Sequence, residues 1–308
     1  MMNILVTGGL GVVGMPLVAE LKKRSHNVAV VDKIHSHLPE YFRCDVGEYR
    51  QIEDIFLKHG PFDYVYHLAA EFGRWNGEDF YETLWRSNVV GTKNLIRLQE
   101  KLGFKMIAAS SSEVYGDYSG VMEEEVMVLN PIRQMNDYAM TKWVNEMQIM
   151  NSSDLNGTST VRVRLFNTYG PGEYYSPYRS CICLFVYNLL HNRPIKVFLN
   201  HTRTSSYIDD TVWTLANIVD NFRAGEVYNI AGKDLHDMKT ASDIILGLLG
   251  KNDSLVEYYD AEPATTLHKR VSSQKALADL GHRSTITLEE GIKRTIEWQR
   301  EVYGIVSR

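Results

Sequence analysis

The chain has 308 residues, of which 44% are hydrophobic and 23% are charged, and this composition suits a large α/β unit with a smaller cap. Its 33 basic and 38 acidic residues give a net charge of −5 without a long block of like charge, which argues against a nucleic-acid binder. No uninterrupted apolar run approaches the ~18–20 residues that a membrane span needs, so we predict a soluble protein without a membrane partner.

Up to about residue 165, short β-rich runs alternate with longer segments of helical length and spacing. The predicted strands are residues 4–6, 28–31, 64–67, 105–108 and 160–165. The predicted helices between them are residues 13–24, 51–59, 80–102 and 138–150. Strands and helices in alternation indicate a parallel sheet whose right-handed crossovers cover both faces.

The second half of the chain is less regular. Glycine, proline and tyrosine cluster in residues 168–177, and the helices predicted after this cluster are residues 181–191, 211–221, 240–249 and 288–302. No Ser/Gly linker marks a boundary, so we expect the two parts to interleave. We predict an α/β fold in which residues 1–166 form a Rossmann-type, doubly wound sheet with a return segment near 204–231. Residues 167–308 would then mainly form a substrate-binding cap.

The three cysteines do not have the spacing of a disulfide framework or a zinc site. Cys181 and Cys183 are one residue apart and have apolar neighbours, so buried structural thiols are the expected outcome. We therefore predict no metal site. A reducing, cytoplasmic setting fits this cysteine content.

The first predicted strand runs directly into a glycine-rich turn and then a helix, which is the context that a dinucleotide fingerprint requires. Gly8, Gly11 and Gly14 would provide a tight turn and a close backbone approach to a pyrophosphate, with Val12 and Val13 in the same turn. The free N–H groups of the helix that follows would face the negative charge. The alternative interpretation is a generic βα turn that happens to be rich in glycine.

The second predicted strand ends at Asp32, 24 residues after Gly8. An acidic side chain there accepts hydrogen bonds from the adenosine ribose and repels a 2′-phosphate, so we predict NAD rather than NADP, with Lys33 as a contrary charge. Asp45 and Val46 follow the short third strand and are predicted to contact the adenine edge. Asp45 would otherwise cap the helix that begins nearby.

Tyr138 and Lys142 are four residues apart and therefore lie on the same face of one predicted helix. A cation beside a phenol lowers the pKa of that phenol, which would make Tyr138 a proton acceptor near neutral pH. Such a pair is common on solvated helix surfaces. Here, however, Tyr138 comes 27 residues after Ser111, and Ser111 itself comes just after a predicted strand.

These motifs recur in one known family. The matching segments are residues 7–14, 67–70, 110–116, 138–142, 164–172 and 203–210, together with Asn88 and Gly91-Thr92 on the long predicted helix. In combination they resemble the extended short-chain dehydrogenase/reductase family, specifically its NAD-dependent nucleotide-sugar epimerases and dehydratases. The resemblance covers nearly the whole chain.

The resemblance implies a shared opening step and a set of cofactor contacts. Tyr138 would take the proton from a sugar 4-hydroxyl while the C4 hydride passes to NAD, and Ser111 would hydrogen-bond the same oxygen. Lys142 would bind the nicotinamide ribose and tune Tyr138. The further residues expected at the cofactor are Leu68, Ala69, Ala70 and Asn88.

The resemblance also implies contacts to the nucleotide-sugar substrate. Asn167 and Arg203 would hold the diphosphate, Arg203 through charge-assisted hydrogen bonds. The remaining predicted substrate contacts are Glu71, Ser112, Arg179 and Arg270. In the family the long helix and the Tyr138 helix commonly pair across a dimer axis, so we expect a homodimer.

The fate of the C4 ketone depends on Glu113 and Ser112. The ketone acidifies the C5 proton, and Glu113 aligns with the glutamate that removes it in family 4,6-dehydratases. Dehydratases acting on dTDP-glucose usually carry an aspartate at the position of Ser112, and serine cannot replace it as a strong acid. GDP-mannose dehydratases and UDP-glucuronate decarboxylases resemble this chain more closely here. The alternative interpretation of Glu113 is a structural carboxylate that binds loop amides.

We therefore predict a 4,6-dehydratase, with a 4-epimerase or a UDP-glucuronate decarboxylase-like enzyme as alternatives. Decarboxylation would need a cation for the sugar carboxylate, and the candidates are Arg74, Arg86 and Arg179, which spacing does not separate. A hypothesis of another class is a non-catalytic NAD-binding regulator. The intact pair of Tyr138 and Lys142 argues against it.

Overall fold

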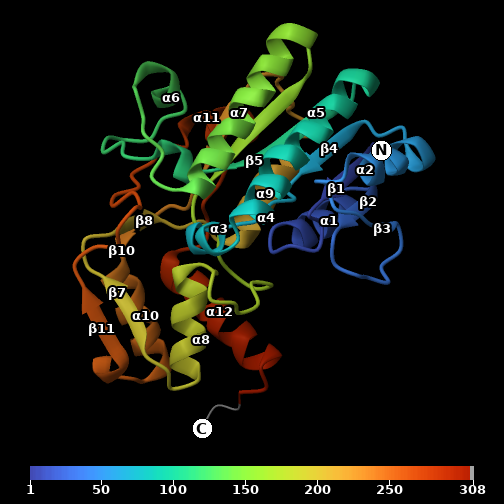
Figure 1. The fold of residues 1–308 in the computed structure, drawn as a ribbon. Helices are drawn as coiled ribbons and strands as arrows, with labels where there is room; N and C mark the ends of the chain where they lie inside the picture. The colour runs from blue at the N-terminus through green and yellow to red at the C-terminus, as the bar shows by residue number, and fades with distance from the viewer. Residues whose placement is uncertain (306–308) are drawn as a thin grey trace.

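A seven-stranded parallel sheet forms the centre of the computed structural model, which describes residues 1–305. The strand order is β3-β2-β1-β4-β5-β6-β9 (Figure 1). The strands are β1 (Asn3–Thr7), β2 (Asn27–Asp32), β3 (Tyr41–Arg43), β4 (Tyr64–His67), β5 (Lys105–Ser111), β6 (Thr160–Leu165) and β9 (Val227–Ile230). The order reverses between β1 and β4, so the predicted Rossmann-type, doubly wound fold is confirmed and a ligand crevice is expected at that point.

Helices cover both faces of the sheet. They include α1 (Gly14–Lys23), α2 (Tyr49–His59), α5 (Gly91–Leu102), α7 (Asp137–Asn156) and α9 (Ile208–Asn217). Alternate residues of β1 enter different cores: Ile4 and Val6 pack with Leu17 of α1, whereas Leu5 packs with Leu95 of α5. Successive strand side chains point to opposite faces, which explains why this strand is apolar throughout.

The remaining elements lie mainly at one end of the sheet, below it in Figure 1. The helices there are α8 (Cys181–Leu190), α10 (Met238–Leu249) and α12 (Leu288–Val302). Two small sheets accompany them: parallel β7 (Ile195–Phe198) with β11 (Val256–Tyr259), and antiparallel β8 (Thr202–Thr204) with β10 (Leu235–Asp237). The shorter helices of the chain are α3 (Arg74–Asp79), α4 (Tyr81–Trp85), α6 (Val126–Leu129) and α11 (Gln274–Leu280). We call the assembly of α8, α10, α12, β7 and β11 the cap.

The helix predicted over residues 80–102 is not continuous. It consists of α4, a π-helical turn (Arg86–Val90) and α5. Within the π turn, Asn88 is buried and its amide bonds the backbone N–H and carbonyl of Glu71 and the hydroxyl of Thr141. The irregular turn therefore ties this helix to the loop after β4 and to α7, a role that helical periodicity alone does not indicate.

Within residues 1–305, no helix is long and apolar enough to cross a membrane. The same residues hold no group of three or more His, Cys, Asp or Glu side chains placed to bind a metal ion. All three cysteines are free thiols; Cys44 and Cys183 are buried, whereas Cys181 is exposed.

Candidate active site

A cavity of about 1130 Å³ opens along the edge where the parallel strands end. Its walls come from the glycine-rich loop, the ends of β2, β4 and β5, the start of α7, and cap residues around α8 and β7. Most residues that the sequence predicted for a site line it. The three exceptions are Asn88, which is buried behind Glu71, Arg270, which is exposed elsewhere, and Arg86. The position at the reversal of strand order is where such sheets bind ligands.

The glycine-rich loop has no room for side chains. Gly8 adopts a φ of 70°, and a Cβ added to it would lie 2.6 Å from the backbone nitrogen of Ala69. A Cβ on Gly14 would lie 2.2 Å from the Gly8 carbonyl oxygen. Helix α1 starts at Gly14. The side chain of its N-cap residue, Val13, makes no capping hydrogen bond. The Met15 N–H bonds the Gly11 carbonyl and Pro16 has no N–H, whereas the N–H groups of Val12, Val13 and Gly14 have no partner in the described chain. These three N–H groups fit a dinucleotide pyrophosphate.

Asp32, which we predict to bind the adenosine ribose, lies at the end of β2 and lines the cavity. Its carboxylate accepts hydrogen bonds from the backbone N–H groups of Leu10 at 3.1 Å and Ile34 at 3.3 Å. Asp45 and Val46 also line the cavity. The Asp45 carboxylate accepts from the N–H of Gly47 at 2.8 Å, as a turn-forming aspartate does, while remaining on the cavity wall.

Lys33, the contrary charge beside Asp32, forms an ion pair with Glu71. The second carboxylate oxygen of Glu71 accepts from Asn76 Nδ2 at 3.1 Å. Because β2 and β4 flank β1, this ion pair joins the two sides of the glycine-rich loop. Glu71, which we predict as a substrate contact, therefore binds Lys33 and Asn76 beside the glycine-rich loop.

Tyr138 and Lys142 lie one turn apart at the start of α7, where Asn136 caps the helix by accepting from the N–H of Ala139. Lys142 Nζ is 5.8 Å from the centroid of the Tyr138 ring and donates to the Ala109 carbonyl at 2.9 Å. Ser111, at the end of β5, lies close enough to the Tyr138 phenol to oppose the rise of its pKa. The predicted group of Ser111, Tyr138 and Lys142 therefore does come together at the cavity.

We predicted that Lys142 lowers the pKa of Tyr138, and this prediction is wrong: the pKa is raised. Burial raises the pKa of Tyr138 to about 12; the nearby Ser111 hydroxyl opposes this rise, and the charge of Glu113 adds to it. Burial lowers the pKa of Lys142 to about 8, against the attraction of Glu146. Desolvation dominates both groups because the phenol and the amine are enclosed.

A buried ionic network connects α7 to the central sheet. Glu146, one turn after Lys142, accepts hydrogen bonds from Ser110 at 2.5 Å and from the Arg164 guanidinium at 2.8 and 2.9 Å. Burial alone would raise the pKa of Glu146, but Arg164, Arg162 and Ser110 outweigh it and hold the pKa below its usual value. The network joins α7 to β5 and β6 and so fixes the helix that carries Tyr138.

At the other end of the cavity, Ser112 and Glu113 meet Lys269. The side chain of Lys269 is 0% exposed, and its Nζ donates to Ser112 Oγ at 3.0 Å and to a Glu113 carboxylate oxygen. Burial alone would raise the pKa of Glu113, but the charge and hydrogen bond of Lys269, with Arg203 and Asn136, lower it. Glu113 is therefore an ionised base at neutral pH.

Sequence reasoning missed Lys269 and chose its neighbour Arg270. The side chain of Arg270 is exposed and does not line the cavity, and its carbonyl accepts from the N–H of Met122 at 2.8 Å. Lys269 points inward because its N–H and carbonyl bond Thr202 and Thr204 of β8. Three successive basic residues, His268 to Arg270, carry no spacing signal that separates the inward one.

The predicted diphosphate ligands lie at the cavity wall. Asn167 has a φ of 43° and a buried Oδ1 without a hydrogen-bond partner in the described chain. Arg203 donates to the carbonyls of Thr202 and Leu267, and its Nη2 is 3.1 Å from His201 Nδ1. Burial lowers the pKa of His201 to about 4, so this ring is a neutral neighbour of the guanidinium.

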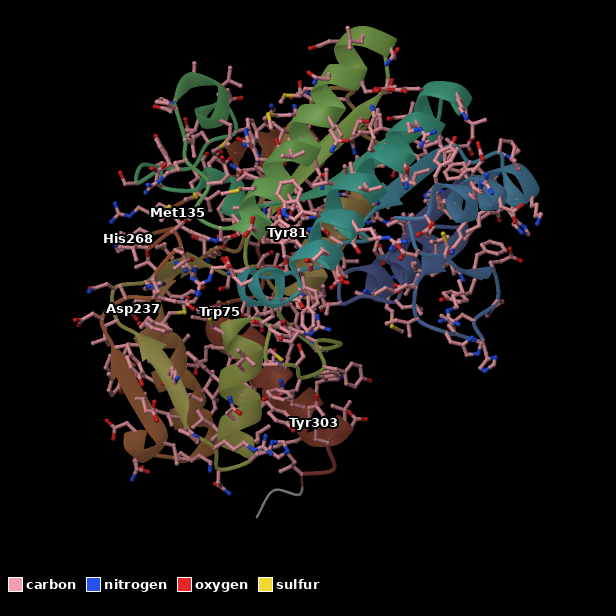
Figure 2. All side chains as sticks on the ribbon, viewed as in Figure 1. Trp75, Tyr81, Met135, Asp237, His268 and Tyr303 are labelled. Carbon is pink, nitrogen blue, oxygen red and sulfur yellow. The ribbon has the colours of Figure 1, made fainter. Side chains whose placement is uncertain are left out.

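The structure separates the three arginines proposed for a sugar carboxylate. Arg86 pairs with Glu48 and does not line the cavity. Arg74 lines it but pairs with Glu262 at 2.6 Å. The same carboxylate accepts from Trp75 at the junction of sheet and cap (Figure 2).

Arg179 differs from both. It lines the cavity over the ring of Phe72, and its guanidinium has no ion pair within residues 1–305. Its Nε donates to the Tyr174 carbonyl at 3.1 Å. Of the three arginines, Arg179 is therefore the one whose charge faces the cavity without a carboxylate partner.

The NAD dependent epimerase/dehydratase family model matches residues 4–231, which include the glycine-rich loop, Ser111, Tyr138 and Lys142. The chain belongs to this family. Its members depend on NAD, and the backbone cradle at Gly8 and Gly14 fits that cofactor.

Relatives in the NAD dependent epimerase/dehydratase family have different reactions in their names. The chain is 27% identical to a UDP-N-acetyl-alpha-D-glucosaminuronate decarboxylase of Bacillus cytotoxicus, over 97% of this chain and 98% of that one. It is also 27% identical to a dTDP-glucose 4,6-dehydratase of Salmonella typhimurium, over 96% and 92%. Among solved structures, a UDP-glucose 4-epimerase of Thermotoga maritima superposes with a TM-score of 0.88 and 25% identity, over 98% and 100%. Overall similarity therefore leaves the reaction open.

Proposed function

We propose that this chain is a NAD-dependent nucleotide-sugar 4,6-dehydratase that works through a 4-keto intermediate. The observation that carries the proposal is the ionised Glu113 carboxylate, which lines the cavity close enough to Tyr138 for its charge to raise the pKa of the phenol. A 4-epimerase needs one acid–base group at C4. A second base beside Tyr138 suits a reaction that also breaks a bond at C5.

Oxidation at C4 is the first step of the proposed reaction. Tyr138 accepts the proton of the 4-hydroxyl, and Ser111, which lies beside the phenol, holds the same oxygen. Lys142 places its positive charge beside Tyr138 and stabilises the phenolate form that accepts this proton. NAD, when bound, takes up the C4 hydride and later returns it to the sugar.

Elimination follows at C5 and C6. The ketone makes the C5 hydrogen acidic, and the Glu113 carboxylate removes it. The sugar is positioned by its diphosphate, for which Arg203 and Asn167 on the cavity wall are the proposed ligands. This arrangement leaves C4 toward Tyr138 and C5–C6 toward Ser112 and Glu113.

Decarboxylation of a nucleotide-linked uronic acid is the second candidate, and Arg179 favours it. Its guanidinium lines the cavity without a carboxylate partner in the described chain and would accept a sugar carboxylate. The named decarboxylase relative is consistent with this alternative. In that case Glu113 would orient the sugar instead of removing the C5 hydrogen.

A product-resolved assay separates these candidates. Recombinant enzyme is incubated with UDP-, GDP-, CDP- and dTDP-hexoses and with UDP-glucuronate, and the products are identified by mass spectrometry and NMR. A dehydratase gives a 4-keto-6-deoxy sugar, a decarboxylase gives CO₂ and a nucleotide pentose, and an epimerase gives an isomer of unchanged mass. Products of the last two kinds alone would refute the dehydratase proposal.

We also infer a cytoplasmic homodimer that pairs through α5 and α7. Exposed apolar residues on and beside these helices support this, namely Val90, Met140 and Met147. Isolated helices in water do not normally carry several exposed apolar side chains on adjacent surfaces. Light scattering at micromolar concentration should give twice the chain mass of 35.3 kDa, and a monomer mass would contradict the inference.

A further inference from the structure

Lys269 lies directly behind the two polar residues at the sugar end of the cavity. Its ammonium contacts both Ser112 Oγ and the Glu113 carboxylate, yet Lys269 is fully enclosed and does not line the cavity. Ser112 and Glu113 do line it. The ammonium can therefore exchange protons with both residues without touching a sugar.

Burial of this ammonium is costly. Taking a charge out of water costs several kcal/mol, and a well-packed apolar side chain in place of a buried ion pair is often as stable. The nearby Arg203 adds like-charge repulsion, and burial with this repulsion lowers the pKa of Lys269 against the attraction of Glu113. Stability alone therefore does not account for a lysine here, and the same surroundings make it a readier proton donor than an exposed lysine.

We propose that Lys269 supplies, through Ser112, the proton that leaves with the C6 hydroxyl, and that Glu113 returns the C5 proton to Lys269. This inference rests on the proposed dehydratase function. Lys269 is a positioning residue in the scheme, because Ser112 is the group that touches the leaving oxygen. It explains how a serine can stand at a position where related dehydratases carry an acid.

The steps balance in protons and electrons. Glu113 takes the C5 proton, and the electrons of the C5–H bond become the second bond between C5 and C6. The C6–O bond breaks with its electron pair on oxygen, which takes the Ser112 hydroxyl proton and leaves as water. Ser112 takes a proton from Lys269 Nζ. Protonated Glu113 then passes its proton to neutral Lys269 along their direct hydrogen bond, which restores all three groups.

Two variants remove different parts of this circuit. Lys269→Arg keeps a positive charge beside Glu113, but a guanidinium does not give up a proton in a protein. Ser112→Ala keeps Lys269 and Glu113 paired and removes the connection to the leaving oxygen. Both should carry out the first hydride transfer and then stall before water loss.

The experiment is a single turnover of the NAD-loaded enzyme with the nucleotide hexose that the wild type dehydrates, in H₂O and in D₂O. Absorbance at 340 nm reports the first hydride transfer, and mass spectrometry with NMR reports deuterium at C5 and loss of water. Each variant should form the reduced cofactor at near the wild-type rate and lose water at least about 100-fold more slowly, within the usual range for a general acid. Ser112→Ala should also take up deuterium at C5 without losing water.

A third variant tests for gain of function. Lys269→Met combined with Ser112→Asp places a carboxylic acid at the leaving oxygen and removes the need for the relay. It should lose water at least about tenfold faster than Lys269→Met alone. Its elimination rate should also lack the decline that the wild type shows as pH rises through the lowered pKa of Lys269. A merely structural lysine would produce neither result.

Water loss by folded Lys269→Arg at the wild-type rate would overturn the relay and leave the dehydratase function intact. Should that variant fail to fold, Ser112→Ala decides alone, and unimpaired water loss would again overturn the relay. A wild type that dehydrates no nucleotide hexose would refute the proposed function and the relay with it. Melting temperature and NAD binding report folding for every variant.

Discussion

The two ends of the cavity are built in different ways. At the cofactor end, the glycine-rich loop is one continuous segment, and its geometry comes from the backbone: Gly8 and Gly14 are required because a Cβ would strike neighbouring main-chain atoms. At the sugar end, the contact between Ser112 and Lys269 joins residues 157 positions apart. The glycine-rich loop at the cofactor end is therefore a local motif that can be recognised in the sequence, whereas the contact at the sugar end joins distant segments.

This difference explains what each end does in the family. A backbone cradle recognises a feature that all NAD molecules share, so it tolerates little change. A cluster of side chains from distant segments can change one member at a time. The named relatives retain the family fold yet carry the names of a decarboxylase, a dehydratase and an epimerase.

The largest effect is expected from Tyr138→Phe, which removes the group shared by every candidate reaction. Turnover should fall by about 10²–10⁴-fold because general acid–base catalysis at C4 is lost. NAD affinity, measured by calorimetry, should change little. Tyr258→Phe on β11, which does not line the cavity, is the matched control. Wild-type turnover by Tyr138→Phe would contradict the role of Tyr138 as the acid–base group at C4, whereas a wild type without any turnover would favour the alternative of a non-catalytic NAD-binding regulator.

Glu146→Gln tests the buried ionic network between Glu146 and Arg164, which fixes the helix that carries Tyr138. Arg164 would remain buried without its carboxylate, which typically costs about 3–5 kcal/mol in the free energy of unfolding. Chemical denaturation at pH 7 measures this. Asp54→Asn, which breaks an exposed ion pair with Lys58, should cost less than about 1 kcal/mol. Equal losses in the two variants would mean that the network contributes nothing special.

The ion pair of Glu146 and Arg164 also predicts how the stability of the protein depends on pH. The folded-state pKa of Glu146 lies below its usual value, so the contribution of the ion pair is complete above the ordinary glutamate range. It is lost as pH falls through the lowered pKa. Wild type should therefore lose more stability than Glu146→Gln between pH 5 and strongly acidic pH, both limits being approximate.

Gly8→Ala tests the cofactor end alone. Alanine at a φ of 70° with a Cβ 2.6 Å from Ala69 stores about 1–3 kcal/mol of strain, and NAD affinity should fall by about 5–150-fold. Gly250→Ala has a similar φ of 64° at the end of α10 but open space around the Cβ. The control should lower stability without changing the Kd for NAD. A parallel change in both would place the effect in general stability.

Lys33→Met should give the smallest effect. The ion pair with Glu71 joins the two sides of the glycine-rich loop, but Lys33 is 57% exposed, and exposed pairs contribute about 0.2–1 kcal/mol. NAD dissociation, followed by cofactor fluorescence with a competing ligand, should accelerate by no more than about fivefold. Lys58→Met is the control. A much larger change would show that Lys33 contacts the cofactor directly.

The features that the sequence predicts correctly are mainly local ones, as at the cofactor end of the cavity, and those it misses depend on contacts between distant segments, as at the sugar end. Five strands of the main sheet and their parallel direction were predicted because they depend on local pattern and on the alternation of strands with helices, whereas β9 and the cap strands were not predicted. The grouping of Ser111 with Tyr138 was implied by the family resemblance. Lys269 was not predicted, because its orientation is set by hydrogen bonds with β8 that only the tertiary fold creates. The pKa of Tyr138 was predicted in the wrong direction because spacing shows a neighbouring charge but not the extent of desolvation.

The placement of Lys269 on the segment that follows β11 also has an evolutionary consequence. This segment lies beyond residue 231, the end of the region that the family model covers, and within it Lys269 itself reaches the cavity only through Ser112 and Glu113. A lineage can alter residue 269 or residue 112 without disturbing the strands that bind NAD. The two positions that would decide how the leaving oxygen is protonated are therefore physically separate from the segment that binds the cofactor.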